Sequence, residues 1–113
     1  MLSRTHRLSD KKDFQKVFLR GKSASTPYYA VRWHSNEMGS PRFGFVVSNK
    51  ISKLATKRNT VRRRLREAVR KNLDPTFPPL DVVFIARSAL LTIPYRELEP
   101  TVVRTLEIVK KRR

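Results

Sequence analysis

The stretch from Lys57 to Lys71, KRNTVRRRLREAVRK, constrains the fold most strongly because it combines an apolar seam with dense positive charge. Its apolar residues recur at i, i+4, i+7 and i+8, the pattern of a helix packed on a core. At about 100° per residue, a second group of side chains gathers on one surface beside that seam. The seam is Val61, Leu65, Ala68 and Val69, and the second group is Asn59, Arg62, Arg63, Arg66 and Arg70. Glu67 is the only acid in the stretch, so these guanidinium groups repel one another unless a polyanion neutralises them.

The charge of the whole chain also points to a polyanionic partner. Its 113 residues include 26 Lys or Arg against 9 Asp or Glu, a formal net charge of +17. Release of condensed counterions drives small basic proteins onto nucleic acid, and a membrane surface is the second polyanion to consider. Hydrophobic residues make up 39% of the chain, so it is not compositionally disordered. We expect a single RNA-binding domain, residues 1–113, with one modest core.

The absence of cysteine excludes disulfides and thiolate metal sites, and it fits a reducing compartment. The N-terminus has no apolar run typical of a signal peptide, and no stretch is long enough to span a bilayer. We therefore expect a cytoplasmic protein without a membrane partner.

The inventory of catalytic side chains is poor. The two histidines, His6 and His34, have no neighbour at metal-ligand spacing, and the acids are not clustered as a two-metal nuclease requires. No serine has a positioned histidine, and the three glycines form no phosphate-binding loop. We expect no catalytic residue, no metal site and no small-molecule substrate, which leaves a binding protein.

One short helix is predicted near the N-terminus. Ser9 can cap a helix from Asp10 to about Arg20, which Gly21 ends, whereas Met1–Leu8 is expected to be extended. Three apolar side chains fall on one side of this helix, Phe14, Val17 and Phe18. From the residues alone, both phenylalanines are most simply explained as core.

Two aromatic-rich stretches, Tyr28–His34 and Arg42–Ser48, are predicted to form a β-hairpin around the turn SNEMGSP. Alternation places one set of side chains on a buried face, namely Tyr29, Val31, Trp33, Phe43, Phe45 and Val47. The opposite face carries an aromatic residue, two arginines and small residues, namely Tyr28, Arg32, Arg42, Gly44 and Val46. That face can receive extended nucleic acid by stacking and charge, or it can be covered by the first helix, and the two can coexist.

The remaining chain is predicted to add one strand and a final helix. Thr56 can cap the basic helix, and Asp81–Arg87, DVVFIAR, is an apolar strand suited to the interior of a sheet. The basic helix would then connect two strands as a β-α-β unit, which makes a parallel pairing plausible. Ser23–Pro27 and most of Ser88–Leu98 are expected to be loops, and Pro100 suits the first turn of the final helix.

Four segments carry a resemblance that covers nearly the whole chain. They are RLSDKKDFQKVF (Arg7–Phe18), PRFGFVVSNK (Pro41–Lys50), KRNTVRRRLRE (Lys57–Glu67) and DVVFIAR (Asp81–Arg87). In this order they resemble the bacterial ribonuclease P protein subunit. The resemblance implies an α+β fold, a compact α-β sandwich of a mixed four-stranded sheet with three helices, similar to the second domain of a small-subunit ribosomal protein. It also implies a left-handed β-α-β crossover, the opposite of the general rule.

The resemblance implies roles for individual residues. Those expected to meet the catalytic RNA are Lys50, Lys53, Arg58, Asn59, Arg62, Arg63, Arg66 and Arg70. Those expected to line a cleft for the single-stranded 5′ leader of precursor tRNA are Phe14, Phe18, Tyr28 and Arg32. Both phenylalanines would then be partly exposed rather than plain core. Thr60 departs from the family, which often has a basic residue there, and Arg32 stands where an aromatic is expected, so guanidinium stacking or a salt link replaces ring stacking.

The implied function is that of the protein subunit of a tRNA 5′-processing endoribonuclease. Hydrolysis would be performed by the RNA subunit with Mg²⁺ bound mainly by RNA, while the protein binds catalytic RNA and leader. The alternative is a ribosomal or nucleoid-type nucleic-acid-binding protein without a role in cleavage. A self-sufficient nuclease is disfavoured by the missing carboxylate cluster. A cationic membrane binder is disfavoured because the apolar strands imply a folded core.

Overall fold

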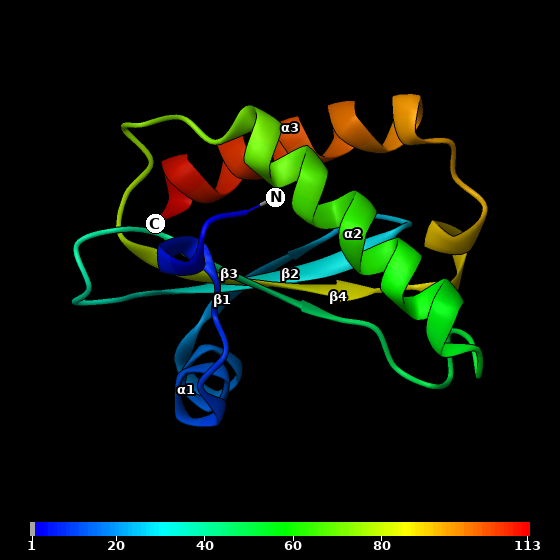
Figure 1. Ribbon diagram of the computed structural model, residues 1–113. Coiled ribbons are helices and arrows are strands. Elements are labelled where there is room, and N and C mark those ends of the chain that lie inside the picture. Colours follow the sequence, from blue (N-terminus) through cyan, green and yellow to red (C-terminus); the bar gives the residue numbers. More distant parts are fainter. Residues whose placement is uncertain (1) are drawn as a thin grey trace.

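The computed structural model describes residues 2–113 and shows a mixed four-stranded sheet between one helix on one face and two helices on the other (Figure 1). The α+β sandwich expected from the resemblance is confirmed. The longer elements are α1 (Lys11–Arg20), β1 (Lys22–Ser25), β2 (Tyr29–Ser35), β3 (Arg42–Val46), α2 (Ala55–Asn72), β4 (Leu80–Ala86) and α3 (Tyr95–Arg112). Two short 3₁₀ helices are η1 (Arg4–His6) and η2 (Ser88–Leu91). No helix among the described residues is long and apolar enough to cross a membrane.

The sheet has the order β1-β2-β4-β3, which confirms β4 as an interior strand and corrects the predicted hairpin. β4 pairs antiparallel with β2 and parallel with β3, so Val31 and Phe45 flank the same residue, Phe84. Six of the seven β4 residues are buried. A strand that is apolar on both faces gains most from a central position, and this explains why it displaces β3 from direct contact with β2. The parallel pairing expected of the β-α-β unit is confirmed, and its handedness stays a prediction.

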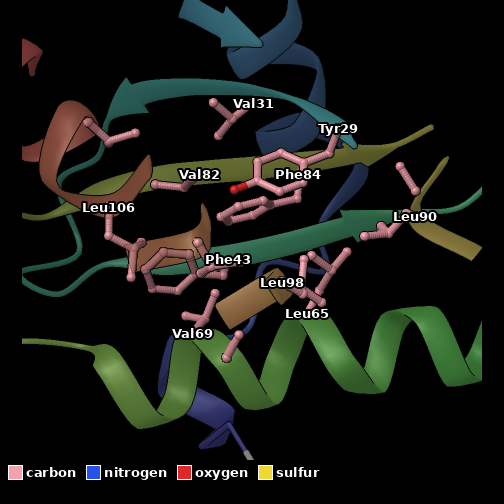
Figure 2. Close-up of a cluster of buried hydrophobic side chains, with 14 of the residues drawn as sticks. Tyr29, Val31, Phe43, Leu65, Val69, Val82, Phe84, Leu90, Leu98 and Leu106 are labelled. Atoms are coloured by element: carbon pink, nitrogen blue, oxygen red, sulfur yellow. The ribbon is translucent and has the colours of Figure 1, made fainter. Parts of the chain in front are cut away.

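The main core lies between the sheet and the helices α2 and α3 (Figure 2). The predicted alternation is confirmed on β2, where Tyr29, Val31 and Trp33 are buried. Tyr29 meets Phe84 edge-on with ring centroids 5.1 Å apart. The predicted seam of α2 is also confirmed, because all four of its residues are buried, Val61, Leu65, Ala68 and Val69. This side of the molecule therefore holds the fold together.

On the opposite face, α1 covers the sheet with a much smaller cluster. Its fully buried members are Leu8, Val17 and Val83, with Phe14 packed against them and only partly buried. Gly44 makes this packing possible, since a Cβ at that position would lie 2.5 Å from the Phe14 ring. We call the sheet surface under α1, together with the side chains that α1 lays over it, the α1 face.

The N-terminal segment is anchored, which corrects the expectation of a simply extended Met1–Leu8. Met1 lies outside the described residues, and Leu2 and Leu8 are buried. The Leu8 amide donates to the Phe43 carbonyl at 2.8 Å, so the segment extends the β3 edge. His6 donates from Nδ1 to the Pro41 carbonyl at 2.7 Å, because a carbonyl only accepts.

Several predicted boundaries are wrong, each for a local reason. Ser23–Pro27 was expected to be loop, but Lys22–Ser25 pairs with β2 as an edge strand. The N-cap of α1 is Asp10 rather than Ser9, and its carboxylate accepts from the Lys12 amide at 2.8 Å.

The basic helix begins at Ala55, so Thr56 lies inside it instead of capping it. The final helix begins at Tyr95 and contains Pro100. In its second turn, a proline removes one intrahelical hydrogen bond, and the buried side chains that follow it outweigh that loss.

Candidate nucleic-acid interface

On one side of α2, hydrogen bonds to backbone carbonyls hold arginine side chains in place. Arg58 donates from Nη1 to the Ser52 carbonyl at 2.8 Å. Arg62 donates from Nη1 to Asn59 Oδ1 at 2.9 Å and from Nη2 to the Val47 carbonyl at 3.4 Å. A guanidinium carries five N–H donors, so these bonds orient the groups and leave other donors for a ligand.

The same side contains Arg66, which was predicted, and Arg7, a cation that the sequence analysis did not select. Arg66 lies over the Phe45 ring, 5.9 Å from its centroid. Burial, followed by the positive charges of Arg7 and Arg62, lowers the pKa of Arg66. Arg7 belongs to the anchored N-terminal segment and donates from Nε to the Leu2 carbonyl at 3.1 Å. In the sequence, the apolar residues Leu2 and Leu8 on either side of Arg7 could have predicted that this segment packs against the rest of the protein.

The loop before α2 adds further cations to this surface. Asn49, Lys50, Lys53 and Arg58 line one hollow, so three of the predicted RNA-binding residues meet there. Lys50 and Lys53 are both exposed. We call this surface the α2 basic flank, made of Arg7, Lys50, Lys53, Arg58, Asn59, Arg62 and Arg66.

Arg63 and Arg70 were predicted with this group, and the structure places them farther around the helix. Arg70 donates from Nε to Glu67 at 3.1 Å, and their ion pair raises the pKa of Arg70 and lowers that of Glu67. Arg63 is exposed and lines a different hollow, beside Tyr95. The predicted RNA-facing set therefore divides into a compact flank and two residues outside it, Arg63 and Arg70.

Three of the four residues predicted for leader binding lie together on the α1 face. Phe18 is 41% exposed, and Phe14 is partly buried over Gly44. Arg32 donates from Nη2 to the carbonyls of Phe18 at 2.8 Å and Gly21 at 3.3 Å, so it ties the end of α1 to β2. The free protein thus uses Arg32 as an anchor that keeps the Phe18 turn of α1 against the sheet.

Tyr28, the fourth predicted residue, lies farther along the strand. It precedes Arg32 by four residues, which is about 13 Å in an extended strand. Its side chain is half-buried against the main core, and its carbonyl accepts from the Arg87 amide at 2.9 Å. The structure does not bring Tyr28 into contact with the two phenylalanines.

Two carboxylates, one on the sheet and one on α1, hold the α1 face together. Arg42 forms two bonds of 2.8 Å to the buried Asp81 and an ion pair of 3.2 Å with Asp13 on α1. These acids raise the pKa of Arg42, with the Asp81 hydrogen bond as the largest cause. Within residues 2–113, no group of three or more His, Cys, Asp or Glu residues could hold a metal ion.

The sequence and the fold are similar to those of known proteins. The family model described as Ribonuclease P matches residues 2–110. A ribonuclease P protein component from Clostridioides difficile is 36% identical over 101 residues, 88% of each chain. The RNase P protein structure from Thermotoga maritima is 31% identical with a TM-score of 0.80, covering 88% of this chain and 94% of that one. The Staphylococcus aureus RNase P protein is 25% identical with a TM-score of 0.83, covering 93% and 95%. The chain therefore belongs to the ribonuclease P protein family.

Proposed function

We propose that this chain is the protein subunit of ribonuclease P, which removes the 5′ leader of precursor tRNA. The observation that carries the proposal is the α2 basic flank. There, Arg7, Arg62 and Arg66 lie close together. Burial lowers the pKa of Arg66, and the positive charges of Arg7 and Arg62 lower it further. Like charges at this spacing destabilise the free protein, and a polyanion relieves that repulsion.

The α2 basic flank supports binding to the catalytic RNA subunit. Arg58 and Arg62 are held by carbonyls from the segment between β3 and α2, so little side-chain freedom is lost on binding. Guanidinium groups bind phosphate oxygens through two parallel hydrogen bonds, which fixes orientation as well as affinity. Such contacts position the protein on RNA of a given shape without reading its sequence.

The α1 face supports binding of the single-stranded leader. Phe18 presents a half-exposed ring beside Phe14, and bases of any sequence can stack on aromatic rings. Leader binding by the protein would raise the affinity of the holoenzyme for precursor over mature tRNA. This division leaves hydrolysis to the RNA subunit, with Mg²⁺ bound mainly by RNA.

The partners of the proposed function are the catalytic RNA and precursor tRNA. Neither a membrane nor a small-molecule substrate has a part in it, and the location would be the cytoplasm, where tRNA is processed in bacteria.

The direct test mixes the purified chain with a catalytic RNA of the ribonuclease P type and precursor tRNA at low Mg²⁺. We expect faster cleavage at the mature 5′ end than with RNA alone. A ribosomal or nucleoid-type protein would bind the RNA without this gain, and that outcome would overturn the proposal.

A paired variant tests the α2 basic flank itself. Arg62→Ala with Arg66→Ala should weaken binding to the catalytic RNA. It should also flatten the dependence of log K on log salt by about 1.5, since each phosphate contact contributes roughly 0.7 to 0.9. The matched control is Arg104→Ala with Lys111→Ala, two exposed cations of α3. An unchanged slope in the α2 variant would show that this flank does not face phosphate.

A further inference from the structure

The side of α2 opposite the α2 basic flank carries a second row of cations. Lys57, Arg64 and Lys71 are seven residues apart, close to two helical turns, so they share one side of the helix. Successive members are about 10.5 Å apart along the axis. At about 100° per residue, Arg64 lies roughly 160° around the helix from both Arg62 and Arg66. We call Lys57, Arg64 and Lys71 the second row.

The second row borders a hollow between α2 and the first turn of α3. Its lining residues are Arg63, Arg64, Glu67, Lys71 and Tyr95. Lys71 Nζ lies 5.5 Å from the Tyr95 ring centroid, so one wall of the hollow is an aromatic ring with a cation over it. Burial and the nearby Glu99 and Glu67 raise the pKa of Tyr95, so its hydroxyl stays neutral and adds no negative charge.

The acids near this hollow are already engaged. Glu67 is bound to Arg70, and Glu99 accepts from Asn72 at 3.0 Å. Within residues 2–113, the side chains of Lys57 and Arg64 form no hydrogen bond and no ion pair, and the third member of the row, Lys71, lies over the Tyr95 ring near the charge of Glu67. On α3, by contrast, Lys110 is paired with Asp74, and exposed glutamates alternate with the exposed cations. The second row is therefore a concentration of positive charge in which Lys57 and Arg64 form no ion pair and Glu67 acts only on Lys71.

The second row and the α2 basic flank lie on opposite sides of one helix. A single RNA groove therefore cannot contact both sets of side chains. A helix with its side chains is about 10–12 Å wide. The major groove of A-form RNA is too narrow to admit side chains, and the minor groove is shallow. A helix with phosphate-binding residues on both sides must therefore lie between two RNA segments.

We propose that the second row binds the phosphate backbone of a second RNA segment, so that α2 is held between two segments of the catalytic RNA. This rests on the proposed function for the identity of the RNA. Lys57 and Lys71 supply exposed ammonium groups, and Arg64 supplies a half-buried guanidinium with free donors. The expected contacts are to phosphate. They should therefore recognise the shape of the RNA and make binding depend on salt, without a preference for sequence.

The test compares two charge-matched variants of the full chain. Lys57→Gln with Arg64→Gln removes two cations seven residues apart on α2, and Arg104→Gln with Lys111→Gln does the same on the exposed face of α3. Binding to a catalytic RNA of the ribonuclease P type is measured over a range of salt concentrations. We expect the α2 variant to flatten the salt slope by about 1.5 and the α3 variant to leave it unchanged. Equal slopes in the two variants, flattened or not, overturn the proposal.

Backbone footprinting of the same RNA separates the two sides of α2. The segment that loses protection with Lys57→Gln and Arg64→Gln should differ from the one that loses protection with Arg62→Gln and Arg66→Gln. Loss at a single common segment, or no loss with the first pair, overturns the second contact. If only the Arg62 and Arg66 variant weakens binding, the proposed function stands and the second row is not part of it. Thermal unfolding of each variant confirms that the fold is retained.

Discussion

The two faces of the sheet are built in opposite ways. The face under α2 and α3 buries large side chains completely, with Trp33, Tyr29, Phe43 and Phe84 each at most 1% exposed. The α1 face has three fully buried hydrophobic residues and leaves Phe18 at 41% exposure. One face holds the larger core, and the other holds a smaller cluster beside a partly exposed aromatic ring. The difference teaches that the aromatic residues of this chain must be assigned by face, because residue type alone does not separate buried rings from exposed ones.

The largest expected effect comes from emptying the main core. Phe84→Ala removes a fully buried ring that contacts both Tyr29 and Phe45. We expect it to lower the free energy of unfolding by about 3–5 kcal/mol. Phe14→Ala on the opposite face should cost clearly less, since its ring is only partly buried. Urea denaturation of both variants measures the difference, and equal losses would contradict the division between the faces.

Alkaline pH should also destabilise the main core. Thr105 donates to the Thr101 carbonyl, so the Tyr29 hydroxyl, 2.6 Å away, must donate to Thr105. Burial raises the pKa of Tyr29 to about 12. The unfolded chain releases this proton near pH 10, so stability is fully present below pH 10 and falls as the pH rises toward 12. At about 1.4 kcal/mol per pKa unit, the loss approaches roughly 3 kcal/mol.

Denaturation at pH 9 and pH 11.5 would check this prediction. Tyr29→Phe should lose much of the pH dependence between these values, and Tyr28→Phe, which retains Tyr29, should keep it. The same pH dependence in both variants would show that other groups cause the alkaline loss.

An intermediate effect is expected where α1 meets the sheet. In Gly44→Ala, the new Cβ would lie 2.5 Å from Phe14 Cζ, so the ring must shift. Such overpacking costs about 1–3 kcal/mol, and the displaced ring should also weaken binding of precursor tRNA relative to mature tRNA. Adding Phe14→Leu should recover part of the stability, which a double-mutant cycle measures. Additive losses would show that Gly44 and Phe14 are not coupled.

The smallest effect on stability is expected at Phe18, where the effect on binding should be specific. Phe18→Ala changes an exposed side chain, so the free energy of unfolding should change by less than about 0.5 kcal/mol. Base stacking on an aromatic ring contributes roughly 1–3 kcal/mol, so affinity for precursor tRNA should fall while that for mature tRNA is retained. Leu19→Ala, at an adjacent position that is 83% exposed, is the matched control. Equal losses for both RNAs would remove Phe18 from the leader surface.

Local sequence patterns predicted most of the helices and strands, but they did not predict which strands pair with one another. The alternation of β2 and the seam of α2 depend on nearby residues, and the structure confirms both. The position of β4 between β2 and β3 depends on contacts between distant segments, which periodicity does not encode. β1, with the sequence KSAS, has no hydrophobic alternation and forms because the β2 edge supplies hydrogen-bonding partners.

The candidate interface divides in the same way. The arginines of α2 were found because they share a helix, and helical spacing is a local signal. Arg7 was missed because it reaches Arg66 only through the pairing of its segment with β3. The tie from Arg32 to the end of α1 was missed for a similar reason, because the sequence does not show where a helix end rests.

The central position of β4 has a consequence for the nascent chain. β2 and β3 have no common partner until Leu80–Ala86 has been synthesised. At roughly 5–20 residues per second, these strands wait for seconds with unpaired edges, a condition that favours aggregation. Residues 1–79 already hold 19 Lys or Arg against 5 Asp or Glu, and the resulting net charge of +14 keeps such chains apart during that time. The cations proposed to bind RNA would thus first keep the unfinished chain soluble, before the sheet has formed.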